Sequence, residues 1–192
     1  EKGWIRSRMV VTDLTRWLQR ALTVCVFLFF GTVAGVFLLG LVLPPQFEVQ
    51  RSLKLDTSRE RLHPFISDLR RWEDWTAWSD RELVHEYSEP SAGVGAWHVW
   101  RESDAGAGRI EITAAGVEEG VWYDMTFDRD TEPMRGAFRY LPSEDGVQIE
   151  WSLRGQLGGP LERALGPIYS WRIGADFDAS LKLLGDLVYA DD

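Results

Sequence analysis

The stretch from Ala21 to Leu43 reads ALTVCVFLFFGTVAGVFLLGLVL and contains no charged residue among its 23 positions. As an α-helix it would extend about 34 Å, compared with about 30 Å for the hydrocarbon core of a bilayer. A cleaved signal peptide has a shorter apolar region and a small-x-small exit, whereas this stretch is followed by two prolines. The sequence therefore predicts a transmembrane anchor helix over residues 21–43, after a short basic segment (1–20) and before a globular domain (46–190).

The basic residues around this stretch indicate its orientation. Five Lys and Arg residues precede it, and the first one beyond it is Arg51. The positive-inside rule then predicts a single-pass protein with a cytoplasmic N-terminus and an extracytoplasmic domain. The asymmetry is confined to the residues nearest the stretch, because four basic residues lie between positions 51 and 61.

The charge and the histidine and cysteine content exclude several kinds of site. The chain carries a net charge of −9, and residues 1–43 carry +3, so the remainder carries −12. A domain this acidic does not suit nucleic acid. Cys25, the only cysteine, lies in the apolar stretch, and the three histidines lack zinc-binding spacing. The sequence also lacks a phosphate-binding or dinucleotide-binding glycine motif, so we expect no metal and no cofactor.

The periodicity of the remaining sequence predicts an α+β domain. Residues 47–55 alternate between apolar and polar, with Arg51 as the exception, and residues 59–67 follow helix-capping residues. Short alternating runs separated by turn residues then predict an antiparallel meander over residues 83–87, 96–102, 109–115, 121–128, 135–141 and 147–154. From Pro160 to Ala190 the spacing becomes helical, and Gly166-Pro167 predicts a break into a short helix and a long one. We expect one curved antiparallel sheet wrapped around the final helix.

Several strings of the domain resemble the SRPBCC superfamily of START/Bet v1-like helix-grip proteins, in particular its bacterial polyketide cyclase/dehydrase-like branch. The strings that carry the resemblance lie in order between residues 47 and 188: Arg51-Ser52-Leu53, Asp68-Leu69-Arg70-Arg71-Trp72, Gly93-Val94-Gly95-Ala96, Trp151-Ser152-Leu153 and Asp176-Phe177. The resemblance implies a helix-grip fold with a hydrophobic-ligand cavity between sheet and C-terminal helix. It does not imply one activity, because the superfamily includes lipid carriers, cyclases, hormone binders and co-chaperones.

Strand alternation and the abundance of tryptophan indicate which residues would line that cavity. Eight of the ten tryptophans follow the apolar stretch, and large aromatic residues suit either an apolar pocket or a filled core. The residues expected to bind a ligand are Trp75, Trp78, His98, Trp100, Tyr123, Met125, Phe138, Trp151, Phe177 and Leu181. No catalytic residue is assigned; His98 and Tyr140 are the weak candidates for an acid/base.

Three functions remain open at this point. The leading hypothesis is a membrane-anchored binding module for a lipid or another hydrophobic small molecule. The first alternative is an enzyme of the cyclase, dehydratase or hydrolase type that uses His98 or Tyr140. The second is a protein-interaction domain without a pocket, whose inner face is filled by its own side chains.

Overall fold

The computed structural model describes residues 3–78, 84–102, 106–127 and 132–190. Leu83 and Asp128, the outer ends of two predicted strands, lie outside the described residues. The chain forms two compact units, of which one contains helix α1 (Gly3–Val42) and the other contains the sheet.

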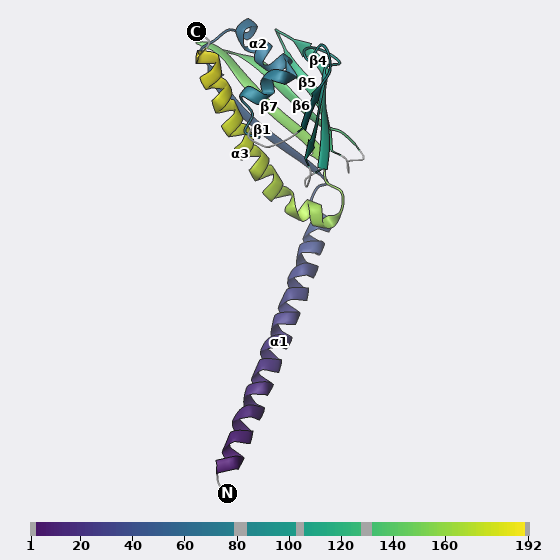
Figure 1. Ribbon diagram of the computed structural model, residues 1–192, viewed down its shortest axis with the longest axis vertical. Coiled ribbons are helices and arrows are strands. Elements are labelled where there is room, and N and C mark those ends of the chain that lie inside the picture. The colour runs from purple at the N-terminus through teal and green to yellow at the C-terminus, as the bar shows by residue number, and fades with distance from the viewer. Residues whose placement is uncertain (1–2, 79–83, 103–105, 128–131, 191–192) are drawn as a thin grey trace. The chain divides into compact units, whose positions relative to one another are not determined.

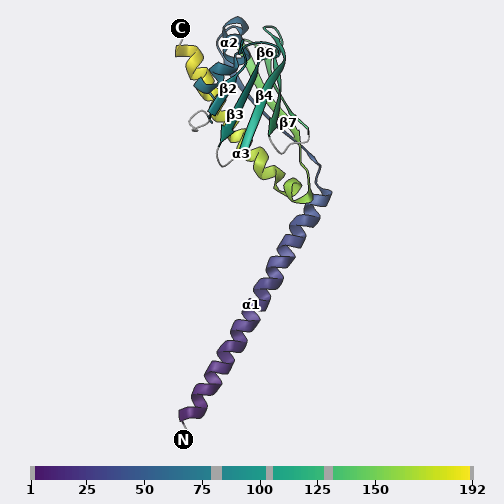
Figure 2. The same ribbon diagram turned by 45° about the vertical axis from the view of Figure 1, so that its right-hand side comes forward.

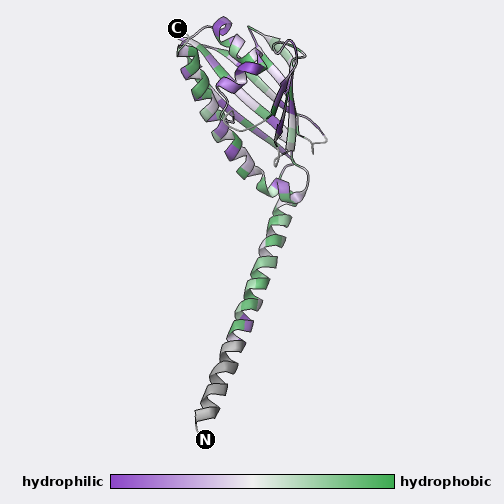
Figure 3. Cartoon of the chain, in the orientation of Figure 1, coloured by the Kyte–Doolittle hydropathy of each residue, from purple (hydrophilic) through white to green (hydrophobic). Residues whose placement is uncertain are grey.

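Residues 21–42 of helix α1 carry no charge, and the hydropathy colouring of Figure 3 shows this part of the helix mostly in green. Its segment Arg16–Val42 spans 27 residues and is long and apolar enough to cross a membrane. Large side chains along it, such as Phe27 and Leu22, are exposed. A helix of this kind is not stabilised by an amphipathic packing face.

Within the described residues, seven antiparallel strands form one curved sheet (Figures 1 and 2). The strands are β1 (Gln46–Leu55), β2 (Val84–Tyr87), β3 (Trp97–Glu102), β4 (Gly106–Gly116), β5 (Gly120–Phe127), β6 (Met134–Ser143) and β7 (Gly146–Gln156). Their order in the sheet is β1-β7-β6-β5-β4-β3-β2, so β2 to β7 form a meander and the first strand joins the last. Gln46 pairs with Gln156 and Leu55 with Val147.

Arg51, which breaks the apolar alternation of β1, lies on the inner face of the sheet with Val49 and Leu53. Its Nε donates to Oδ2 of Asp178 over 2.9 Å. Asp178 belongs to helix α3 (Pro160–Ala190). The exception to the strand pattern is therefore an ion pair between the sheet and the helix that covers it.

One predicted helix is confirmed and the other differs from its prediction at one place. Helix α2 (Arg59–Ser67) begins at the predicted cap, where Ser58 Oγ accepts from the Arg61 backbone N–H, but the next tryptophan-rich turn is a 3-10 helix, η1 (Leu69–Asp74). The predicted break at Gly166-Pro167 is wrong, because α3 is continuous through Pro167. A proline within a helix removes one hydrogen bond and disfavours the helix without excluding it, and the buried residues of α3 other than Gly166 lie beyond Pro167, from Gly174 to Val188.

The predicted fold class is confirmed: a curved antiparallel sheet holds a long C-terminal helix against its inner face. Buried side chains of the sheet meet Phe177, Leu181 and Leu184 of α3, while α2 and η1 close one end. This arrangement leaves one inner surface, between sheet and helix, on which a site can form.

Candidate functional site

A cavity of about 230 Å³ lies between the inner face of the sheet and helix α3. Its described lining residues come from η1 and the turn after it, six strands and α3: Trp72, Glu73, Thr76, Trp78, His85, Tyr87, His98, Trp100, Ile110, Met125, Phe127, Met134, Leu153, Ile173, Asp176 and Phe177. Most of these are apolar or aromatic, which is the usual composition of a site for an apolar small molecule.

The neighbouring part of the inner face is filled by aromatic rings. Trp151 stacks on Phe177 with ring centroids 3.7 Å apart, and it also contacts Trp75 and Phe138 at 5.8 and 4.7 Å. The indole N–H of Trp151 donates to the Tyr123 hydroxyl over 2.8 Å. All of these side chains are almost completely buried, so this part is packed core.

The structure divides the residues expected to bind a ligand into two groups. Trp78, His98, Trp100, Met125 and Phe177 line the cavity. Trp75, Tyr123, Phe138, Trp151 and Leu181 lie in the hydrophobic core and are not among the lining residues. Ligand binding by the first group stays a prediction.

Tyr140, the second acid/base candidate, lies away from the cavity. Its hydroxyl is 3.2 Å from Nδ1 of His63 in α2, and the two rings meet edge to face. Burial raises the pKa of Tyr140 and lowers that of His63. Tyr140 is therefore not positioned to act on a molecule in the cavity.

The main polar feature of the cavity is a pair of histidines that the sequence interpretation did not connect. Nδ1 of His85 is 2.8 Å from Nε2 of His98. His98 also stacks on Tyr87 with centroids 4.4 Å apart. The signal lay in the strand register: Tyr87 pairs with His98 and His85 with Trp100, so alternate residues of β2 and β3 face the same side. Without that register, the thirteen-residue separation of the two histidines indicates nothing.

Glu73 of η1 completes this polar group. It accepts a short hydrogen bond from the Tyr87 hydroxyl, and its Oε1 lies 4.0 Å from Nδ1 of His85. Burial and, to a smaller extent, the neighbouring His85 together lower the pKa of His98 to about 4. Burial and the hydrogen bond to Glu73 raise the pKa of Tyr87. At neutral pH His98 is therefore uncharged.

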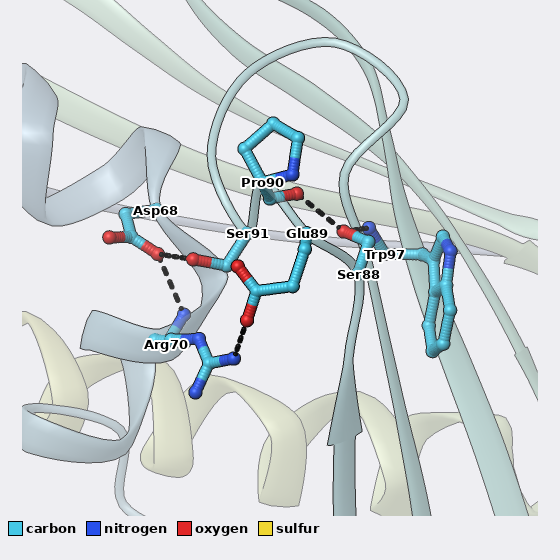
Figure 4. A network of polar contacts seen from close by, with 7 residues as sticks. All are labelled: Asp68, Arg70, Ser88, Glu89, Pro90, Ser91 and Trp97. Carbon is cyan, nitrogen blue, oxygen red and sulfur yellow. Dashed lines mark hydrogen bonds and ion pairs between the residues drawn. The ribbon is translucent and has the colours of Figure 1, made fainter.

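A network of polar contacts fixes the loop between β2 and β3 against η1 (Figure 4). Asp68 Oδ1 accepts from Ser91 Oγ over 2.7 Å and from the Arg70 backbone N–H over 3.0 Å, and Arg70 pairs with Glu89. Ser88 Oγ donates to the carbonyl of Pro90 and accepts from the Trp97 N–H. The loop connects the strands that carry the two histidines to the turn that carries Glu73.

Among the described residues, no group of three or more His, Cys, Asp or Glu side chains is placed to hold a metal ion. The histidine pair with Glu73 is held by hydrogen bonds and stacking instead. What these groups offer chemically is hydrogen bonding to a molecule in the cavity, or proton transfer to one.

No family model matches the sequence, and no curated protein matches it either. Solved structures do match. The di-domain ARO/CYC protein StfQ from the steffimycin biosynthetic pathway gives a TM-score of 0.61 at 9% identity, over 76% of this chain and 51% of StfQ. The protein DynU16 from the dynemicin biosynthetic locus gives 0.54 at 10% identity, over 76% of this chain and 48% of DynU16.

Aha1 from Colwellia psychrerythraea gives a TM-score of 0.55 at 10% identity, over 74% of this chain and 96% of Aha1. This chain thus spans about half the length of StfQ and DynU16 and almost all of Aha1. The predicted resemblance is confirmed at the level of architecture: the chain has the helix-grip fold of SRPBCC-type proteins. Identities this low say nothing of a shared ligand or reaction.

Proposed function

We propose that the chain is a membrane-anchored binding protein for a small hydrophobic molecule, which it holds between the sheet and helix α3. The observation that carries this proposal is the cavity. A sheet and a helix that pack only to stabilise each other close their interface to the density of a protein interior. Here the interface is closed at one end and hollow at the other, and the hollow part is lined mostly by apolar side chains.

The size of the cavity limits the ligand. Pockets for drug-sized molecules enclose about 300–1,000 Å³, and this one encloses about 230 Å³. A molecule of one or two rings, or part of a single alkyl chain, matches this volume. A whole two-chain lipid exceeds it, so the proposal favours a compact ligand over a phospholipid.

The anchor supports a ligand that comes from a membrane. Leu153, Met125 and Met134 line the cavity and lie toward the end of the sheet where β1 begins. β1 begins at Gln46, four residues after the end of α1 at Val42. Four residues extend at most about 14 Å, so an α1 that spans a bilayer keeps the start of β1 near its surface. Such tethering raises the local concentration of a membrane-dissolved ligand.

The test is to identify molecules that co-purify with the full chain in lipid nanodiscs, by solvent extraction and mass spectrometry. Met134→Trp places a bulky ring in the cavity. Arg135→Trp places the same ring on the opposite, exposed face of β6 and is the matched control. We expect one apolar compound to be enriched in the wild type and in Arg135→Trp, and depleted in Met134→Trp.

Equal recovery from all three proteins would contradict the proposal, because the compound would then come from the surrounding lipid. Absence of any enriched compound, repeated after exposure to membrane extract, would favour the alternative of a protein-interaction domain. Both outcomes depend on the variants being folded, which near-UV circular dichroism checks.

The histidine pair favours a second candidate function, an enzyme that uses His98 as an acid/base. An uncharged histidine within a cavity can accept a proton from a bound molecule. If His98 acts in this way, His98→Phe would accumulate a compound whose mass differs from that found in the wild type. If the pair only binds, both proteins would hold the same compound.

A further inference from the structure

We infer that the His85–His98 pair is a recognition site for an uncharged ligand that carries a hydroxyl or carbonyl group. This inference rests on the proposed function and specifies the ligand class of the same cavity. It follows from the hydrogen-bonding capacity of the pair, from the charges around it, and from the apolar wall opposite it.

The hydrogen-bonding capacity does not depend on the tautomers. Each neutral imidazole has one N–H donor and one acceptor nitrogen. The contact between Nδ1 of His85 and Nε2 of His98, at 2.8 Å, uses one donor and one acceptor. One donor and one acceptor therefore remain on the two outer nitrogens. A hydroxyl can satisfy either nitrogen, and a carbonyl can accept from the donor.

The surrounding charges oppose an anionic ligand. Glu73 and Asp176 line the cavity, and none of its described lining residues is Lys or Arg. A carboxylate group would meet two like charges, with no positively charged side chain among the described lining residues to pair with it. An anionic fatty acid is therefore a poor candidate, although its chain alone would match the walls.

A cationic ligand is a less favourable match than a neutral one. Glu73 already accepts from the Tyr87 hydroxyl and lies beside His85. Burial keeps His98 uncharged at neutral pH, with a pKa of about 4. The pair thus presents a neutral polar spot beside the rings of Tyr87 and Trp100, which contact His98. A compact aromatic alcohol or ketone complements both properties.

The experiment compares four two-ring probes that differ in one substituent: naphthalene, 1-naphthol, 1-naphthoate and 1-naphthylmethylammonium. Binding to the full chain in lipid nanodiscs is measured by equilibrium dialysis, with empty nanodiscs subtracted. His98→Phe removes both nitrogens and keeps an aromatic ring. His63→Phe, outside the cavity and hydrogen-bonded to Tyr140, is the matched control.

We expect 1-naphthol to bind the wild type more tightly than the other three probes. His98→Phe should lose roughly three- to tenfold in affinity for 1-naphthol, the value of one hydrogen bond, and keep its affinity for naphthalene. His63→Phe should behave as the wild type.

Three results would overturn the inference. Equal affinities for naphthalene and 1-naphthol would show that the His85–His98 pair does not recognise the hydroxyl group. Tightest binding of the anion or the cation would assign the site to a charged ligand. Binding of no probe would remove the cavity function itself, and with it this inference. In the first two cases the proposed cavity function would stand.

Discussion

The two ends of the inner sheet face are built from the same kinds of residue and differ in how these fill space. At one end Trp75, Phe138 and Trp151 contact one another, with centroids 4.7 to 5.9 Å apart. At the other end Trp78 and Trp100 line a cavity of about 230 Å³. The packed end has α2 beside it, whereas the cavity extends from Trp72 and Glu73 of η1 toward the start of β1.

The two ends differ in how far their polar groups are hydrogen-bonded within the protein, as well as in how completely their side chains fill the space. At the packed end, the indole N–H groups of Trp75 and Trp151 both donate to protein acceptors. In the cavity, the contact between His85 and His98 uses one donor and one acceptor of the pair and leaves one donor and one acceptor for another molecule. Buried polar groups are normally satisfied, so the packed end is complete and the cavity end is open to a partner molecule.

The largest expected effect is a difference between truncations at the two ends. Trp151→Ala should lower the free energy of unfolding by about 3–5 kcal/mol, because it empties a fully packed site and leaves the Tyr123 hydroxyl without its donor. Trp100→Ala should cost no more than about 2 kcal/mol, because its ring already borders empty space. Denaturant unfolding of the full chain measures both, and equal losses would contradict the division into packed and hollow ends.

Much of the fold could be predicted from the sequence because strand alternation and turn residues are local signals. Six predicted runs correspond to β2 to β7, and the predicted helix at 59–67 corresponds to α2. The continuous course of α3 through Pro167 could not be predicted, because a Gly-Pro pair disfavours a helix as a local tendency and does not exclude one. The 3-10 form of η1 likewise depends on its contacts with the β2–β3 loop.

The candidate site was less predictable, for a geometric reason. Alternation assigns a side chain to the inner face of the sheet but does not say whether that face is filled. Trp151 and Trp100 therefore received the same prediction, although the first is core and the second lines the cavity. The contact between His85 and His98 depends on the register of β2 against β3. The sequence predicts a register only where a short turn of known type joins two strands, and the β2–β3 loop is not such a turn.

A smaller effect should follow from two glycines that lie against aromatic rings. A Cβ added at Gly136 would lie 1.9 Å from Cζ of Tyr123, and one added at Gly108 would lie 2.1 Å from Cζ2 of Trp100. Tyr123 is enclosed in the core, so Gly136→Ala should cost about 1–3 kcal/mol of unfolding free energy. Trp100 can move into the cavity, so Gly108→Ala should cost less than about 1 kcal/mol. Denaturant unfolding compares the two; a larger loss for Gly108→Ala would mean that Trp100 is as fixed as Tyr123.

The smallest expected effect is a pH dependence that belongs to the cavity end alone. The pKa of His98 falls from 6.5 to about 4 on folding, through burial and the neighbouring His85. Between these values the unfolded chain binds more protons than the native one, so the contribution of His98 to stability is present above pH 6.5 and is lost as the pH falls toward 4. Allowing for screening at the partly open cavity, the loss should be of the order of 1 kcal/mol.

The measurement is the unfolding free energy of the wild type and of His98→Phe at pH 7.5 and pH 5. Subtracting the values of the two proteins at each pH removes the contribution of all the other titratable groups. The charged or titratable groups that face His98 are His85, Tyr87 and Glu73. Glu73 favours protonated His98, so Glu73→Gln should lower the pKa of His98 further; because native His98 is already almost fully unprotonated at pH 5, the loss between the two pH values should stay nearly unchanged. A loss that is unchanged by His98→Phe would assign the pH dependence to another group and leave His98 without a measurable role in stability.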